Sequence, residues 1–168
     1  MTALAGDSRA DADVEDARET LAEFKANDAE LQAHLDEAVA YVVFQEVGKG
    51  GFVFAGGQGE GILFENNIPR GRVSLRLLSV GAQVGGQRFS ELIIIKDASA
   101  LKNFKRGRAE LQAGVSAVGA GKSASRQLQY QDGIAVMTRV HSGVMAEASV
   151  GRQKFTFQRF EKETQPGT

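Results

Sequence analysis

The chain has 168 residues, of which 42 % are hydrophobic and 24 % charged, which favours a single globular domain with a substantial core. It contains no cysteine, which excludes disulfides, thiolate metal sites and thiol nucleophiles, and no run reaches the roughly 18 apolar residues of a membrane-spanning helix. The net charge of −1 hides a split, because residues 1–40 carry eleven acidic and three basic residues while residues 41–168 carry ten acidic and seventeen basic ones.

Two amphipathic helices are predicted near the N-terminus. Residues 1–9 are expected to form a disordered end, and a helix is expected from Ala10. The apolar residues that follow recur at steps of three and four, as on one helical stripe: Val14, Ala17, Leu21 and Phe24. Asn27 followed by Glu30 predicts a capping box at the start of a second helix. The inward face of that helix is expected to comprise Leu31, Leu35, Ala38 and Val39.

Beyond Ala40 the hydrophobic period becomes that of strands. Strands are predicted at 40–45, 51–57, 61–65, 72–86, 88–96, 109–118, 125–131, 133–140, 143–150 and 152–160. A hairpin loop is expected at 66–71. One later helix is predicted at 97–107, with Asp97 as its N-cap and Gly107 as its end.

This order of elements predicts an α+β fold. The N-terminal helices are expected to pack on a large, curled, barrel-like antiparallel sheet with one short inserted helix. A single domain is predicted over residues 10–160, followed by a tail at 161–168. Twenty glycines beside only two prolines fit a sheet with many turns and bends.

The glycine-rich stretch GGFVFAGGQGEG (50–61) could cradle a phosphate or could bend a strand. A dinucleotide fingerprint needs G-x-G-x-x-G between a strand and a helix. Here Gly57, Gly59 and Gly61 are followed by Ile62 where glycine is required, and a strand-like ILFE comes next. The pattern therefore favours bends and close backbone approach over nucleotide binding.

A second glycine-rich segment, SAVGAGKS (116–123), resembles a P-loop but has Ser116 in place of its first glycine. It is interpreted as a loop between strands. His34, in a helix, and His141, expected in a turn, have no partner at metal-ligand spacing, and neither metal nor cofactor is predicted. Glu60 and Glu65 could pair across a hairpin, but they form no defensible acid–base set. An enzyme is the least favoured class.

Several segments together resemble the SYLF domain family over about residues 28–160. VVFQEVGKGGFVFAGGQGEGILF (42–64) is similar to its opening signature, a Gly-Phe strand and a GEG turn. VSLRLLSVGAQVGGQRFSELIIIKDASALKNF (73–104) resembles its central segment, and GVMAEASVG (143–151) its closing strand. The residues that match the family motif are Gly51, Gly59, Glu60, Gly61, Gly81, Gln83 and Gly85.

The resemblance implies a lipid-binding module without enzymatic activity. Eukaryotic relatives bind phosphoinositides and some bind actin filaments, whereas bacterial relatives stand alone and are often exported or lipid-anchored. Two features depart from the family: Gln45 replaces its usual proline, and the N-terminal helices are acidic where some members have basic, membrane-inserting ones. A periplasmic or membrane-peripheral location after removal of a leader is favoured over the cytoplasm.

An anionic lipid head group would have to meet the basic part of the chain. The expected contacts are Lys102, Lys105, Arg106 and Arg108, joined by Lys122 and Arg126 on the next loop. Lysine at a helix C-terminus is also favoured by the helix dipole alone, and the basic and acidic parts could simply neutralise each other. Both interpretations stay open.

Two other functions remain as alternatives. The protein could be a structural or protein-interaction domain with an actin-like or cell-envelope partner, in which the acidic helices dock on the basic body or on that partner. Alternatively, the barrel interior could carry an apolar ligand. No nucleic-acid partner is expected, and the sequence leaves the lipid species and the oligomeric state undetermined.

Overall fold

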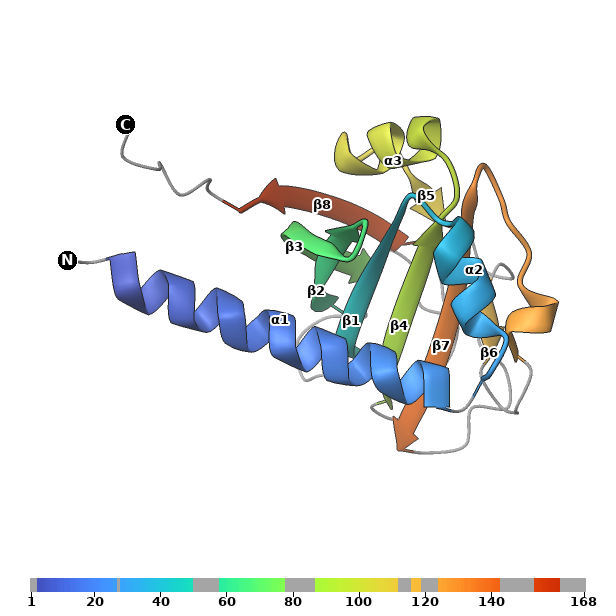
Figure 1. Cartoon of the computed structure of the whole chain (residues 1–168), viewed down its shortest axis with the longest axis horizontal. Coiled ribbons are helices and arrows are strands. Elements are labelled where there is room, and N and C mark those ends of the chain that lie inside the picture. The colour runs from blue at the N-terminus through green and yellow to red at the C-terminus, as the bar shows by residue number, and fades with distance from the viewer. Residues whose placement is uncertain are drawn as a thin grey trace.

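The computed structural model describes residues 3–26, 28–49, 58–77, 87–111, 116–118, 124–142 and 153–160. These residues form the α+β fold that the sequence predicts, with one short helix inserted among the strands (Figure 1). The elements are α1 (Ala3–Ala26), α2 (Leu31–Glu37), β1 (Ala40–Lys49), β2 (Gln58–Glu65), β3 (Ile68–Leu77), β4 (Gln87–Ile95), α3 (Ala98–Lys105), β5 (Glu110–Leu111), β6 (Ser116–Val118), the 3-10 helix η1 (Ala124–Gln127), β7 (Ile134–Ser142) and β8 (Gln153–Arg159).

The strands form one sheet in the order β5-β8-β3-β2-β1-β4-β7-β6. Every pairing from β5 to β7 is antiparallel, and only the short edge strand β6 pairs parallel, with β7. Strands β1 and β4 therefore lie near the middle of the sheet, which explains why both read as nearly continuous apolar runs.

The sheet is strongly curled. Leu111 ends β5 and Ser116 begins β6, so five peptide steps hold the two edges of the sheet within about 18 Å of each other. A hydrogen bond of 2.9 Å from Gln153 Nε2 on β8 to Glu91 Oε2 on β4 links strands with three others between them in the sheet order. Only a curled sheet brings β8 and β4 together in this way.

The curled sheet is not a closed barrel in the described residues. Strands β5 and β6 end the strand order and do not pair with each other. They have two and three residues, and β6 runs parallel to its neighbour, so they provide too short a ladder to join the edges. The predicted barrel-like curl is present, but complete closure is not.

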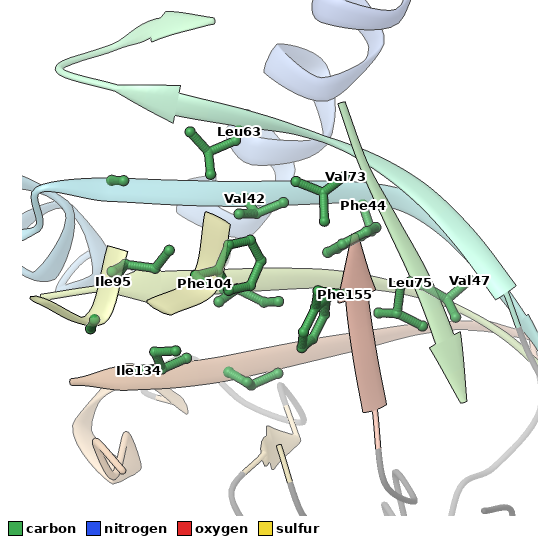
Figure 2. Close-up of a cluster of buried hydrophobic side chains, with 14 of the residues drawn as sticks. Val42, Phe44, Val47, Leu63, Val73, Leu75, Ile95, Phe104, Ile134 and Phe155 are labelled. Atoms are coloured by element: carbon green, nitrogen blue, oxygen red, sulfur yellow. The ribbon is translucent and has the colours of Figure 1, made fainter. Parts of the chain in front are cut away.

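The concave face of the sheet holds one hydrophobic cluster, which we call the inner cluster. Figure 2 shows Phe104 from α3 and Phe155 from β8 pointing into the same space as Phe44 and Val73. The rings of Phe104 and Phe155 have centroids 5.0 Å apart, and those of Phe44 and Phe155 are 6.2 Å apart. Helix α3 thus supplies side chains that fill the concavity.

The opposite face holds the outer cluster and is covered by α1 and α2; in Figure 1, α1 crosses in front of β1. The apolar stripe predicted for α1 is confirmed, because Ala17, Leu21 and Phe24 are buried there. From α2, Leu31 and Leu35 are buried in the same cluster. Of the other two residues predicted to face inward, Ala38 packs against this cluster, whereas Val39 packs against the inner one.

The helix starts differ from the predictions. Helix α1 begins at Ala3, so the expected start at Ala10 is wrong. Helix α2 begins at Leu31, and Glu30 makes no side-chain capping hydrogen bond. Instead, Asp28 Oδ1 accepts a hydrogen bond from the Glu30 N–H at 3.1 Å, so an aspartate replaces the predicted capping box. Asn27 lies outside the described residues.

Helix α3 follows the sequence closely. Asp97 Oδ1 accepts a hydrogen bond from the Ala100 N–H at 2.8 Å, as an N-cap does. Gly107 has a φ of +71°, in the left-handed region where a glycine ends a helix at little cost. The predicted start and end of this helix are therefore confirmed.

Several strand predictions need correction. The loop at 66–71 is only a two-residue turn, because Asn66 and Asn67 tolerate their positive φ values and β3 starts at Ile68. The predicted strand 125–131 is wrong, since η1 occupies its start, and the expected single strand 109–118 is represented by the separate β5 and β6. The strands expected at 51–57 and 143–150 lie outside the described residues.

The role of glycine where neighbouring strands approach closely can be tested by substitution. A Cβ at Gly71 would lie 2.3 Å from the Gln158 carbonyl oxygen on β8, whereas one at Gly48 would meet nothing within 4 Å. We predict that Gly71→Ala lowers the free energy of unfolding by about 1–3 kcal/mol through overpacking. Gly48→Ala, the matched control, should change it little. Urea unfolding measures both, and equal effects would contradict the role of close approach.

Candidate functional site

The described residues of the first glycine-rich motif, 58–61, belong to β2 and lie close to β1. Gly59 and Gly61 lie within β2, and Gly59 pairs with Val47. A Cβ on Gly61 would lie 2.6 Å from the Val43 carbonyl oxygen, and one on Gly59 would lie 3.0 Å from that of Glu46. The prediction that these glycines permit close approach is confirmed at both positions. No helix follows them directly, since β2 runs on into the turn to β3.

The remaining family-motif residues are only partly described. The expected GEG turn is wrong, because Glu60 lies in β2 with its exposed carboxylate 3.9 Å from the Arg72 guanidinium. Glu60 and Glu65 belong to the same strand and do not pair. Gly51, Gly81, Gln83 and Gly85 lie outside the described residues.

The second glycine-rich motif leads to η1, which has a structural role. Ser116 lies in β6, and residues 119–123, with Lys122, lie outside the described part of the chain. The following Ser125 is buried, and its N–H and hydroxyl donate to the two carboxylate oxygens of Asp28 at 2.6 and 2.7 Å. These bonds turn the chain inward at Ser125, which explains why a strand does not form here.

The two histidines belong to different elements, His34 to α2 and His141 to β7. His34 Nδ1, on α2, is 3.1 Å from the Tyr130 hydroxyl, and burial raises the pKa of Tyr130 with help from Glu37. His141 belongs to β7, so the expected turn is wrong; β7 continues pairing with β4 as far as Ser142. The described residues contain no group of three or more His, Asp or Glu that could hold a metal ion.

Ion pairs join the acidic helix α1 to the sheet. Asp13 on α1 pairs with Arg72 on β3, and Glu23 on α1 pairs with Arg139 on β7. These contacts dock α1 on the sheet, which is one of the two alternatives that the sequence leaves open for the acidic helices. The interpretation that the two oppositely charged parts neutralise each other therefore holds for these pairs.

Only part of the predicted basic cluster is available to bind an anionic ligand, because two of its members pair with acidic residues. Lys105 pairs with Glu65 and lies 5.6 Å from the centre of the Phe157 ring. Arg126 pairs with Glu30, and this pairing lowers the pKa of Glu30 and raises that of Arg126. Because α2 packs on the outer cluster and α3 on the inner one, Arg126 does not converge with the α3 residues. Three basic residues are exposed and have no ion pair with another described residue: Lys102, Arg106 and Arg108.

The structure adds residues from the β2–β3 hairpin and the end of β8 to this basic end of α3. Glu65 binds Lys105 and also lies 3.3 Å from Arg70 Nε, so it ties the hairpin to α3. Gly71, next to Arg70, pairs with Arg159 of β8. We call this group the basic corner; its members are Arg70, Lys102, Lys105, Arg106, Arg108 and Arg159.

Ile68 lies at the basic corner, in register with Glu65 across the hairpin. It is 49 % exposed, and among the residues whose side chains are described no other large hydrophobic one is exposed. The sequence signal was an apolar residue directly after the Asn66–Asn67 turn. Sequence reasoning missed it because a longer loop was expected there.

Buried polar side chains lie inside the concave face. Glu91 is fully buried, and Gln153 and Thr138 are within 1 % of full burial. The hydrogen bond from Gln153 to Glu91 gives this carboxylate a partner across the concavity. This hydrogen bond fixes how β8 lies over β4, because separating the two side chains would remove a donor from a buried carboxyl oxygen.

Asp28 joins the start of α2 to η1. Burial would by itself raise the pKa of Asp28, but the hydrogen bonds from Ser125 and from the Glu30 and Leu31 backbone outweigh it, and the pKa lies below its ordinary value. The ionised carboxylate therefore stabilises the folded chain at neutral pH.

Comparison with protein-family models finds no matching family, and no curated protein matches the chain. The resemblance to the SYLF domain family thus stays a prediction. Among the described residues, no helix has the length and apolar character needed to cross a membrane.

The Asp28 network predicts a pH-dependent effect. Ser125→Ala removes a hydrogen bond to a buried carboxylate and should lower the free energy of unfolding by about 1.5–3 kcal/mol at neutral pH. Because the folded pKa of Asp28 is depressed, its contribution is complete above the unfolded pKa and disappears as the pH falls through the folded one. The deficit should therefore shrink in acid.

Urea unfolding over a pH series measures this difference. Ser74→Ala, at an exposed position of β3, is the control and should leave stability nearly unchanged at every pH. A deficit of the same size at neutral and acidic pH would show that the Asp28 carboxylate is not involved.

Proposed function

We propose that the protein is a non-enzymatic module that binds anionic lipid surfaces through the basic corner. The observation that supports this most is the exposed Ile68 beside a group of cations of which several have no acidic partner among the described residues. An apolar tip within a basic surface suits a membrane interface, where the side chain enters the head-group region and the cations meet lipid phosphates.

The charge balance of the basic corner supports the same function. Glu65 is shared between Lys105 and Arg70, so one acid serves two cations there. By contrast, Arg72 and Arg139 pair with acids of α1. Each basic residue near an anionic surface contributes about 1 kcal/mol, so the corner would give reversible, salt-sensitive association.

The two alternative functions are less well supported. Phe44, Phe104 and Phe155 fill the described part of the concave side, so an acyl chain would have to displace them. Docking of α1 on a protein partner is also disfavoured, because Leu21 and Phe24 of α1 are buried in the outer cluster and moving the helix away would expose that cluster.

Vesicle binding tests the basic corner. We expect the protein to float with vesicles of phosphatidylcholine and phosphatidylserine at low salt, and less so with phosphatidylcholine alone. Lys102→Gln combined with Arg106→Gln should weaken binding by about 30-fold, from about 1 kcal/mol per residue. The matched control is Arg76→Gln with Lys154→Gln, which removes the same charge from exposed positions of β3 and β8.

Two outcomes would contradict the proposal. Equal recovery of the protein with neutral and anionic vesicles would show that it does not recognise anionic head groups. Equal loss in both double variants would show that net charge alone attracts the protein, without a defined surface.

Ile68 gives a second, independent prediction. Ile68→Ser should weaken vesicle binding severalfold at low and at physiological salt, because transfer of an apolar side chain is not screened by ions. Since the side chain is half exposed, thermal unfolding should change little. If Ile68→Ser floats with vesicles as well as the unsubstituted protein, binding is purely electrostatic and the hairpin does not insert into the membrane.

A further inference from the structure

A pocket of about 480 Å³ lies between α1, α2, the start of β1 and the turn that joins β2 to β3. Its size falls within the range of small-ligand sites. It opens on the face of the sheet that α1 and α2 cover, whereas α3 packs against the inner cluster on the other face. The pocket is therefore separate from the α3 cations of the basic corner.

Two cations of α1 line the pocket. Arg18 and Lys25 are seven residues apart, which places them on the same side of the helix about two turns from each other. Arg18 is held in place, since its Nη2 donates to the Asn67 carbonyl oxygen at 3.4 Å and its guanidinium lies 5.2 Å from the centre of the Phe64 ring. Lys25 is exposed and has no ion pair with another described residue.

Hydrogen-bonding groups form the other walls. The Tyr41 hydroxyl donates to Asn67 Oδ1 at 3.0 Å, which fixes the Asn67 amide and leaves its NH₂ group available as a donor. On α2, Gln32 Nε2 donates to Asp36 Oδ1 at 2.8 Å, so the carboxylate keeps acceptor capacity for a further donor. Asp36 is the only acidic residue in the lining, beside two cations.

We propose that this pocket binds a small polar molecule that carries an oxyanion group and hydroxyl groups. The oxyanion, a phosphate or a carboxylate, binds at the wall formed by Arg18 and Asn67, where a planar guanidinium and an amide both donate. The hydroxyl groups donate to Asp36 at the opposite wall. Lys25 adds a second positive charge.

Calorimetric titration with glycerol 3-phosphate tests the pocket, with glycerol as the neutral probe. We expect glycerol 3-phosphate to bind and glycerol not to bind. Arg18→Gln and Lys25→Gln should each weaken binding by about tenfold or more, as expected for loss of a charged hydrogen-bond donor. Arg76→Gln removes the same charge from exposed β3, outside the pocket lining, and should leave binding unchanged.

Folding is controlled separately, because Arg18 also contacts Phe64 and Asn67. Thermal unfolding of each variant shows whether it is folded. If Arg18→Gln is not folded, the test rests on Lys25→Gln, because the Lys25 side chain is exposed and its loss should not disturb folding. Absence of heat with glycerol 3-phosphate and with phosphatidylglycerol vesicles, or equal loss in Arg76→Gln, would overturn the proposal.

A further arm identifies the source of the phosphate. If phosphatidylglycerol vesicles give a heat of binding that glycerol 3-phosphate does not give, and Lys25→Gln abolishes this heat, the pocket binds a lipid head group. Heat with glycerol 3-phosphate that persists in the double variant Lys102→Gln with Arg106→Gln would assign it to a free metabolite. This second result stands even if vesicle binding at the basic corner fails.

Discussion

The structure depends on a sheet whose central strands are buried on both faces. Along β1, Val42 and Phe44 enter the inner cluster while Tyr41 and Val43 enter the outer one. A strand of this kind is stable only if both of its faces are covered. Helices α1 and α2 cover the outer face, and the curl of the sheet together with α3 covers the inner face. Each helix is therefore part of the core.

The curl follows from local features of the strands. A register shift in β1 between Phe44 and Val47 leaves Gln45 and Glu46 exposed and returns Val47 to the inner cluster. Such bulges bend a strand and increase its twist. Gly71 then lets β3 approach β8 so closely that a Cβ would collide with the Gln158 carbonyl oxygen. Bends and missing side chains thus bring β8 across the concavity to Glu91.

The charges follow the same division between faces. On the outer face, acids of α1 bind Arg72 and Arg139, so part of the positive charge of the sheet is neutralised within the molecule. At the basic corner, Glu65 serves two cations, and others have no acidic partner among the described residues. Because paired charges produce a weak field beyond their contact, attraction for an anionic surface concentrates where the pairing is incomplete. This asymmetry underlies the proposed membrane contact.

The sequence by itself determined the fold class and several of the local elements. The period-3.6 stripe of Ala17, Leu21 and Phe24 and the alternation of β3 were sufficient, because these patterns depend on which residues recur on one side of an element. The caps of α3 were readable for the same reason, since Asp97 and Gly107 act within a few residues of their own position.

Only the tertiary structure decided which charges remain available. Lys105 and Arg126 resemble Lys102 and Arg106 in the sequence, but their partners Glu65 and Glu30 are 40 and 96 residues away. Likewise, the pocket beside Arg18 exists only where two helices and a hairpin turn meet. Contacts between segments this far apart depend on the curl and on the packing of the helices, which no local pattern encodes.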